Sequence, residues 1–184
     1  MPGPRFPTAR ALFDAFPEVF QKISTAPTEQ SPTHFLKGLS SADKLPEAVT
    51  FCAYLLPRRE AVWWACRSVR TLSDDIAPDR DAGLLAAEAW VYEPEENHRE
   101  TALDVGTKGE SKNPTTWLAL AAGWSGGFLP STTSQQPVPV PQYMTPRAVR
   151  IAVLTSVPKV HPSERSARLQ KCIDEGIKLA ETGL

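Results

Sequence analysis

The chain has 184 residues, of which 41% are hydrophobic, and its formal net charge at pH 7 is −1. This length suits one domain that buries a hydrophobic core, and the hydrophobic content argues against a wholly disordered chain. A charge so close to zero gives no overall attraction to nucleic acid or to anionic membranes, so we expect no nucleic-acid partner.

The beginning of the chain does not have the features of an export or membrane signal. Its first residues, MPGPRF, lack the continuous apolar segment of a signal peptide. No later run approaches the ~20 apolar residues that a membrane-spanning helix needs. We therefore expect a cytoplasmic protein without a membrane span.

Residues 1–31 predict a hydrophobic arm followed by a linker. Thr8 can cap a helical segment, and Pro17 should break or kink that segment because proline lacks a backbone N–H. The candidate oligomerisation residues of this arm recur with helical spacing: Phe13, Phe16 and Phe20. An arm of this kind can pack in trans, which makes a homodimer one candidate assembly.

Residues 32–184 predict an all-helical domain, because apolar residues recur there with helical spacing. Prolines and capping side chains mark where the helices start. The expected helices begin near Pro32, Pro46, Pro57, Asp79, Pro94, Asn113, Thr145 and Ser163, with stops at Gly106 and Gly183. Glu88 falls on the apolar side of its helix, so it should pair with an arginine, since an isolated buried carboxylate is very costly.

Strand-like alternation is nearly absent, and we predict an all-α fold. The helices are expected to form a compact bundle or a short helical stack of six to eight helices, with antiparallel neighbours joined by short connections. A proline-rich loop at residues 125–144 interrupts them, and its prolines exclude a central strand. Its proline segment, residues 134–144, is either a docking ligand for another protein or, as we expect, a brace across its own domain.

The three cysteines and three histidines do not predict a metal site or a cofactor. The cysteines are odd in number and form no C-x-x-C pair, so we expect buried thiols. The histidines are far apart in sequence. The acidic residues near His98 are typical of a helix start, where they compensate the helix dipole.

The helix that begins near Pro57 carries the one unusual feature. Its apolar residues fall on one stripe at about 100° per residue, whereas a second stripe combines a large aromatic ring with arginines. The residues of this second stripe are Arg59, Trp63, Arg67 and Arg70. Tryptophan and arginine are enriched in interface hot spots, so the stripe is a candidate partner-binding surface. The alternative is that the tryptophan packs under a neighbouring helix and the arginines pair with acids.

Ser125 lies in a G-x-S-x-G pattern, GWSGG. A hydrolase nucleophile elbow needs a strand before this serine and a helix after it. Here a helix is expected before it and a glycine-rich loop after it. The pattern therefore fits a helix C-terminus, at which Gly126 or Gly127 adopts the left-handed conformation.

Three blocks of the sequence resemble a family of uncharacterised bacterial proteins of this size: LPRREAVWWAC at 56–66, AEAWVYEP at 87–94 and WSGG at 124–127. The resemblance extends over residues 32–182. That family is associated with type VI secretion gene neighbourhoods in proteobacteria. The resemblance implies an accessory, adaptor or chaperone-like role and supplies no catalytic residue.

Taken together, the sequence favours a non-enzymatic protein-interaction module, with a secretion-system component or effector as a candidate partner. Two alternatives remain. One is a hydrolase-like enzyme that uses Ser125, and the other is a purely structural or oligomerising helical protein.

Overall fold

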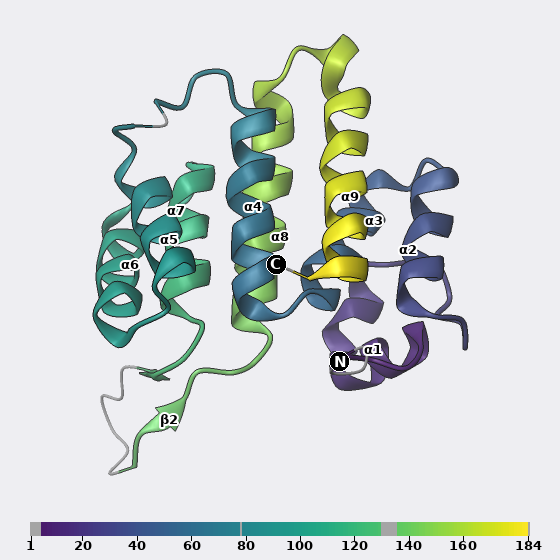
Figure 1. Ribbon diagram of the computed structural model, residues 1–184, viewed down its shortest axis with the longest axis horizontal. Helices are drawn as coiled ribbons and strands as arrows, with labels where there is room; N and C mark the ends of the chain where they lie inside the picture. The colour runs from purple at the N-terminus through teal and green to yellow at the C-terminus, as the bar shows by residue number, and fades with distance from the viewer. Residues whose placement is uncertain (1–4, 78, 130–135, 184) are drawn as a thin grey trace.

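The computed structural model describes residues 5–77, 79–129 and 136–183, and this part of the chain forms nine α-helices and one two-stranded sheet (Figure 1). The α-helices are α1 (Ala9–Ala15), α2 (Pro32–Ser41), α3 (Leu45–Leu55), α4 (Arg58–Leu72), α5 (Ala82–Tyr92), α6 (Glu96–Lys108), α7 (Pro114–Gly123), α8 (Met144–Ser156) and α9 (Arg165–Thr182). Three short 3-10 helices accompany them: η1 (Pro17–Gln21), η2 (Val157–Lys159) and η3 (Pro162–Glu164). The predicted all-α fold is confirmed, and eight of these α-helices lie between residues 32 and 184.

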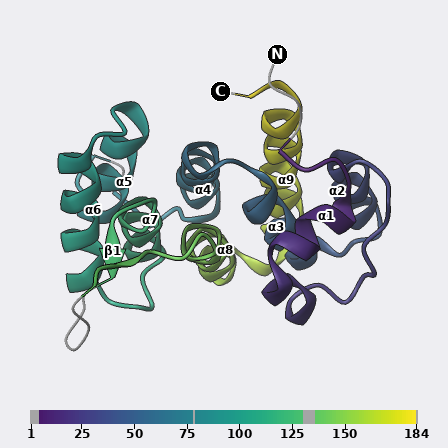
Figure 2. The ribbon, with the colours of Figure 1, turned by 90° about the horizontal axis from the view of Figure 1, so that it is seen from below.

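The helices are stacked in two layers. Helices α5, α4 and α9 form one layer, and α7, α8 and α3 form the other, with α6 at one end and α2 at the opposite end (Figure 2). From α2 to α9, successive helices run in alternating directions (Figure 1). Helix α8 lies at the centre and packs against α7, α4 and α3. Helices that follow one another in the chain are therefore antiparallel as expected, whereas α4 and α8, which also pack together, run in the same direction.

Capping residues begin several helices where the sequence predicts them. The Thr8 side chain accepts a hydrogen bond from the N–H of Ala11, and Asn113 accepts one from the N–H of Thr115. Both bonds satisfy backbone donors that a helix start leaves unpaired. Helix α1 ends at Ala15, before Pro17, as the missing N–H of proline requires.

Two predicted boundaries are wrong. Helix α5 is capped by Asp81, whose carboxylate accepts from the N–H of Leu84, and not by Asp79. Helix α6 does not stop at Gly106 but continues to Lys108. A Cβ at position 106 would lie 2.8 Å from Leu120, so this glycine allows α6 to approach α7 closely.

The N-terminal arm packs onto the helical body. Phe13 is 0 % exposed and lies in the same hydrophobic cluster as Phe35 of α2 and Phe51 of α3. Their ring centroids lie 6.0 Å and 6.1 Å from that of Phe13. Glu47 adds a polar attachment, because its carboxylate accepts hydrogen bonds from the linker. The arm therefore contributes to the core of the chain.

The proline-rich loop 125–144 forms a small hairpin in its described part. Strand β1 (Phe128–Leu129) pairs with β2 (Val138–Pro139) in antiparallel register, and residues 130–135 lie outside the described residues. The hairpin projects beyond the ends of α7 and α8 (Figure 1), and Phe128 is 61 % exposed. The expected brace across the domain is therefore not formed by the described residues.

No helix in the described part of the chain is both long enough and apolar enough to cross a lipid bilayer.

Candidate functional site

Helix α4 separates its side chains into the two predicted stripes. The inner stripe is buried throughout: Ala61, Val62, Ala65, Cys66 and Val69. The outer stripe lies on the opposite side of the same helix, and its members are Arg59, Trp63, Arg67 and Arg70. These four do not share one environment, because the outer stripe meets α5 on one side and α9 on the other.

Arg59 and Arg70 fasten α4 to α5. The Nε of Arg59 donates to the carbonyl oxygen of Val91 at 2.6 Å, which satisfies an acceptor that the end of α5 leaves open. Arg70 donates from Nε and Nη2 to the two carboxylate oxygens of Glu88, both at 2.9 Å. The expected pairing of Glu88 with an arginine is confirmed, and the hydrogen bond to Glu88 raises the pKa of Arg70. Both arginines thus serve the packing of the fold.

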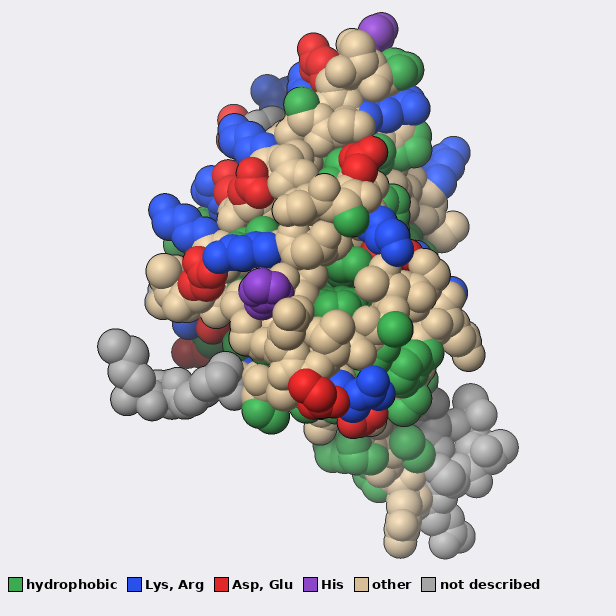
Figure 3. Space-filling model, turned by 90° about the vertical axis from the view of Figure 1, so that its right-hand side faces the viewer, with side chains coloured by type: hydrophobic (Ala, Val, Ile, Leu, Met, Phe, Trp, Pro, Cys, Tyr) green, Lys and Arg blue, Asp and Glu red, His purple; other side chains and the backbone are tan. Residues whose placement is uncertain are grey.

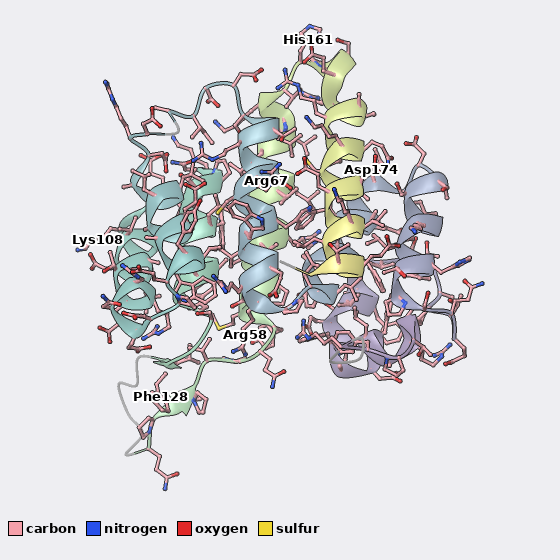
Figure 4. All side chains as sticks on the ribbon, in the orientation of Figure 1. Arg58, Arg67, Lys108, Phe128, His161 and Asp174 are labelled. Atoms are coloured by element: carbon pink, nitrogen blue, oxygen red, sulfur yellow. The ribbon has the colours of Figure 1, made fainter. Side chains whose placement is uncertain are left out.

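Arg67 lies on the side of α4 that faces α9 (Figure 4), and both Arg67 and Trp63 line a hollow together with residues of α9. Arg67 donates to the carboxylate of Glu175 at 3.3 Å and 3.4 Å, and its guanidinium carbon lies 5.7 Å from the centroid of the Trp63 ring. Trp63 is partly buried, and its ring meets that of Tyr92 edge-on with centroids 6.4 Å apart. The indole is neither enclosed in the core nor fully outward, but packs at its margin between a cation and a second ring.

A groove of about 350 Å³ runs beside Trp63, between α4 and the C-terminal half of α9. Its lining residues are Trp63, Trp64, Arg67, Glu175, Lys178, Leu179, Thr182 and Gly183. The rings and the Leu179 side chain supply apolar surface, and the charged groups stand at its edge. A concave surface of this composition suits a bulky apolar side chain of a ligand with polar groups nearby.

The adjacent tryptophan, Trp64, anchors the groove in the core. It is 1 % exposed, and its Nε1 donates to the carbonyl oxygen of Cys172 in α9 at 2.7 Å. Gly176 permits this approach, since a Cβ there would meet Trp64 Nε1 at 2.9 Å and also contact the Cys52 sulfur. Trp64 therefore holds α4 and α9 at the spacing that leaves the groove open beside it.

The face of the molecule that carries α2 shows a mixed surface. Lysine, arginine, aspartate and glutamate side chains are interspersed on it without a continuous basic area (Figure 3). This face offers no track of positive charge of the kind that single-stranded nucleic acid needs.

The three phenylalanines of the arm differ in accessibility. Phe13 and Phe16 are buried within the chain, the latter with its ring 5.1 Å from that of Tyr54. Phe20 is 50 % exposed, although its ring also contacts Phe13. A homodimer joined through the arm would therefore depend on Phe20.

Ser125 follows helix α7 directly after the cap residue Trp124, and no strand precedes it. Gly127 has a φ of 76°, which confirms the predicted left-handed glycine after the helix. The carbonyl oxygen of Ser125 accepts a hydrogen bond from Arg58 at 2.6 Å. The segment has the geometry of a helix end and not that of a nucleophile elbow.

All three cysteines are free and buried, as predicted. Within the described residues, no group of three or more histidine, cysteine, aspartate and glutamate side chains is placed to hold a metal ion.

Two residues beside the Trp63 ring and its groove are missed by the sequence analysis. Tyr92 belongs by spacing to the apolar face of its helix, yet it is 71 % exposed beside Trp63, because α5 ends there and its last turn is uncovered. Lys178 lines the groove from α9, and its ammonium group makes no ion pair with the residues that the structure describes. Helical spacing places Lys178 on the outer side of α9, but nothing in the sequence shows that α4 lies beside it.

One comparison with known proteins gives a match. The model of a protein family matches residues 35–180, and its description is "Family of unknown function (DUF6931)". No curated protein and no solved structure matches the chain.

Proposed function

The chain belongs to DUF6931, a family of unknown function. We propose that it is a non-enzymatic protein-interaction module that binds a partner in the groove between α4 and α9. The observation that carries the proposal is the position of Trp63. A partly buried indole at the mouth of a groove, next to the exposed ring of Tyr92, is typical of a binding hot spot.

The groove favours a partner segment with one bulky apolar side chain and a neighbouring acidic residue. The apolar side chain would lie against Trp63 and Leu179. The acidic residue would pair with Lys178, which lacks an ion pair within the described residues. Arg67 is already paired with Glu175, so it does not offer a free charge to the partner. Its role would be to hold the Trp63 ring in position.

The finer part of the proposal concerns the partner. The sequence blocks around Trp63, Trp90 and Trp124 resemble proteins associated with type VI secretion, and this resemblance supports an adaptor or chaperone role in the bacterial cytoplasm. The partner would then be a secretion component or an effector.

Site-specific cross-linking can identify the partner. A photoreactive amino acid at Thr182, which lines the groove, should capture the partner in cells. The same probe at the exposed His161, just before η3 and beyond the start of α9, should not (Figure 4). The captured protein, identified by mass spectrometry, is then purified and titrated against the unmodified chain. Equal capture from both positions would contradict the proposal.

The affinity of that purified partner measures the role of Trp63. We expect Trp63→Ala to weaken binding by about 2 kcal/mol, or about thirtyfold, as for other interface hot spots. Phe128→Ala is the matched control, because Phe128 is an exposed ring on the hairpin and away from the groove. Unchanged affinity in a folded Trp63→Ala variant would exclude the groove as the binding surface.

The non-enzymatic part of the proposal has its own test. An active serine hydrolase would react with a fluorophosphonate probe through its nucleophile. We expect no labelling of the purified chain. Labelling that disappears in Ser125→Ala would establish the alternative enzyme.

A further inference from the structure

A second cavity, of about 360 Å³, lies where the N-terminal arm approaches α8. It is formed by η1 and the residue after it, the end of α3, and α8 with the residue before it; α3 and α8 lie side by side in Figure 2. Its lining residues are Glu18, Gln21, Lys22, Tyr54, Tyr143, Arg147, Arg150 and Ile151. Its volume is within the range of cavities that bind small molecules.

Arg150 is held in a fixed position in this cavity. Its Nε donates to the hydroxyl oxygen of Thr50 at 2.9 Å, and that hydroxyl group donates in turn to the carbonyl oxygen of Pro46 at 2.8 Å. Neither terminal nitrogen of Arg150 has a hydrogen-bond partner among the described residues. The free side of this guanidinium group can therefore form the paired hydrogen bonds by which arginine recognises carboxylates and phosphates.

Arg147 adds a second positive charge one turn earlier on α8. Its side chain forms no ion pair within the described residues, and the first turn of α8 contains no acidic residue. The positive end of the helix dipole lies at the same place. Burial, together with the charge of Arg147, lowers the pKa of Arg150. Arg147 is exposed and Arg150 is half-buried, so the two positive charges repel each other, and a bound anion would offset that repulsion.

Glu18 is the carboxylate that lines this cavity, and it does not neutralise the arginines. Neither arginine forms an ion pair with it, and its Oε1 is buried without a hydrogen-bond partner in the described part of the chain. Glu18 instead neighbours Tyr54, whose pKa is raised by burial and by this carboxylate. Tyr54 therefore keeps its proton at neutral pH, and its hydroxyl group interacts with the Glu18 carboxylate.

We propose that this cavity binds a small molecule in which a carboxylate or phosphate group is attached to an apolar body. The oxyanion lies between Arg147 and Arg150. The apolar body lies against Ile151 and the ring of Tyr143. This site is separate from the groove beside Trp63 and does not depend on the function proposed for that groove.

Small aromatic probes test the proposal. Phenyl phosphate and benzoate carry the two oxyanions on an apolar ring, and benzamide has nearly the shape of benzoate without the charge. Titration calorimetry, with backbone amide NMR shifts to locate binding, should show that one or both anions bind near Arg150 and that benzamide binds at least about tenfold more weakly. The ratio of the two anion affinities tells a phosphate site from a carboxylate site. Benzamide binding as tightly as the anions, or no binding of either anion at millimolar concentration, would overturn the proposal.

Arginine-to-glutamine variants assign the binding to the two arginines. Arg147→Gln combined with Arg150→Gln should weaken binding of the preferred anion at least about tenfold. Arg80→Gln is the control, because Arg80 is exposed in the loop before α5 and lies outside this cavity. If the double variant does not fold, the exposed Arg147→Gln alone should weaken binding at least about threefold. Affinity equal to that of the unmodified chain, or an equal loss in Arg80→Gln, would show that the arginines do not form the site.

Discussion

The groove beside Trp63 and the cavity beside Arg150 have similar volumes and similar components. Each contains one carboxylate and aromatic rings, with two basic side chains in the groove and three in the cavity, where Lys22 joins the two arginines. In the groove, Glu175 is paired with Arg67, and Lys178 forms no ion pair with any described residue. In the cavity, Glu18 is paired with neither arginine.

This difference determines which ligand each site favours. Where the charges neutralise each other, the remaining attraction comes from apolar rings, which suits a side chain of a protein partner. Where two guanidinium groups remain unpaired, the attraction is electrostatic and suits an anion. Composition alone would have assigned both sites to the same class.

The largest expected effect on the free energy of unfolding distinguishes the two tryptophans of α4. Trp64→Ala should destabilise the fold by about 3–5 kcal/mol, because it removes a buried ring and its hydrogen bond to Cys172. Trp63→Ala should cost only about 1 kcal/mol, since Trp63 is partly exposed. Urea unfolding followed by circular dichroism measures both values. An equal loss of stability in the two variants would mean that Trp63 is a core residue and does not belong to a binding groove.

An intermediate effect on stability is expected when the ion-paired Arg70 is compared with Arg147, which forms no ion pair with the described residues. Arg70→Met should destabilise the fold by about 1–2 kcal/mol, because it leaves the half-buried Glu88 without its partner. Arg147→Met should change stability by less than about 0.5 kcal/mol, because no ion pair is lost. Both variants lose one positive charge, so each controls for the other in the same unfolding assay. A large loss in Arg147→Met would indicate that its charge already has a stabilising role in the fold.

The smallest expected effect on stability concerns Glu47. Its carboxylate accepts several hydrogen bonds, whereas Oε1 of Glu18 accepts none from the described residues. Burial alone would raise the pKa of Glu47, but hydrogen bonds from the side chains and backbones of Ser24 and Thr25 outweigh it and hold the pKa at about 2. A pKa below the ordinary value of 4.5 stabilises the folded state above that pH. This stabilisation should decline as the pH falls from 4.5 toward 2.

The variant Glu47→Gln isolates this contribution. Its free energy of unfolding should be lower than that of the unmodified chain at pH 7, and the gap should narrow as the pH approaches 2. Denaturant unfolding at a series of pH values measures the gap. A gap that is constant with pH would show that the Glu47 charge does not hold the arm.

Much of the fold was predictable because its signals are local. Thr8, Asn113 and Gly183 each mark a helix end by their own chemistry, and all three lie at the predicted helix ends. The pairing of Glu88 was also predictable, because burial of a carboxylate demands a cation. The misplaced stop at Gly106 arose because a glycine ends a helix in one context and admits a neighbouring helix in another.

The sites were less predictable because they depend on which helices become neighbours. The stripe of Arg59, Trp63, Arg67 and Arg70 is visible in the sequence, but its division between α5 and α9 is not. The cavity gives no local signal, since Glu18, Tyr54 and Arg150 come from three elements far apart in the chain. Periodicity shows which face of a helix is apolar, and only the packing shows what that face meets.

The three buried cysteines allow the separation of the helices to be measured by chemical labelling. Cys52 and Cys172 lie at the junction of α3, α4 and α9, and Cys66 lies on the inner side of α4. Burial raises the pKa of all three thiols, that of Cys172 to about 11, so few thiolates exist at neutral pH. Alkylation must therefore wait until the helices separate, and its rate at each cysteine, read by mass spectrometry, would reveal the order in which the layers come apart.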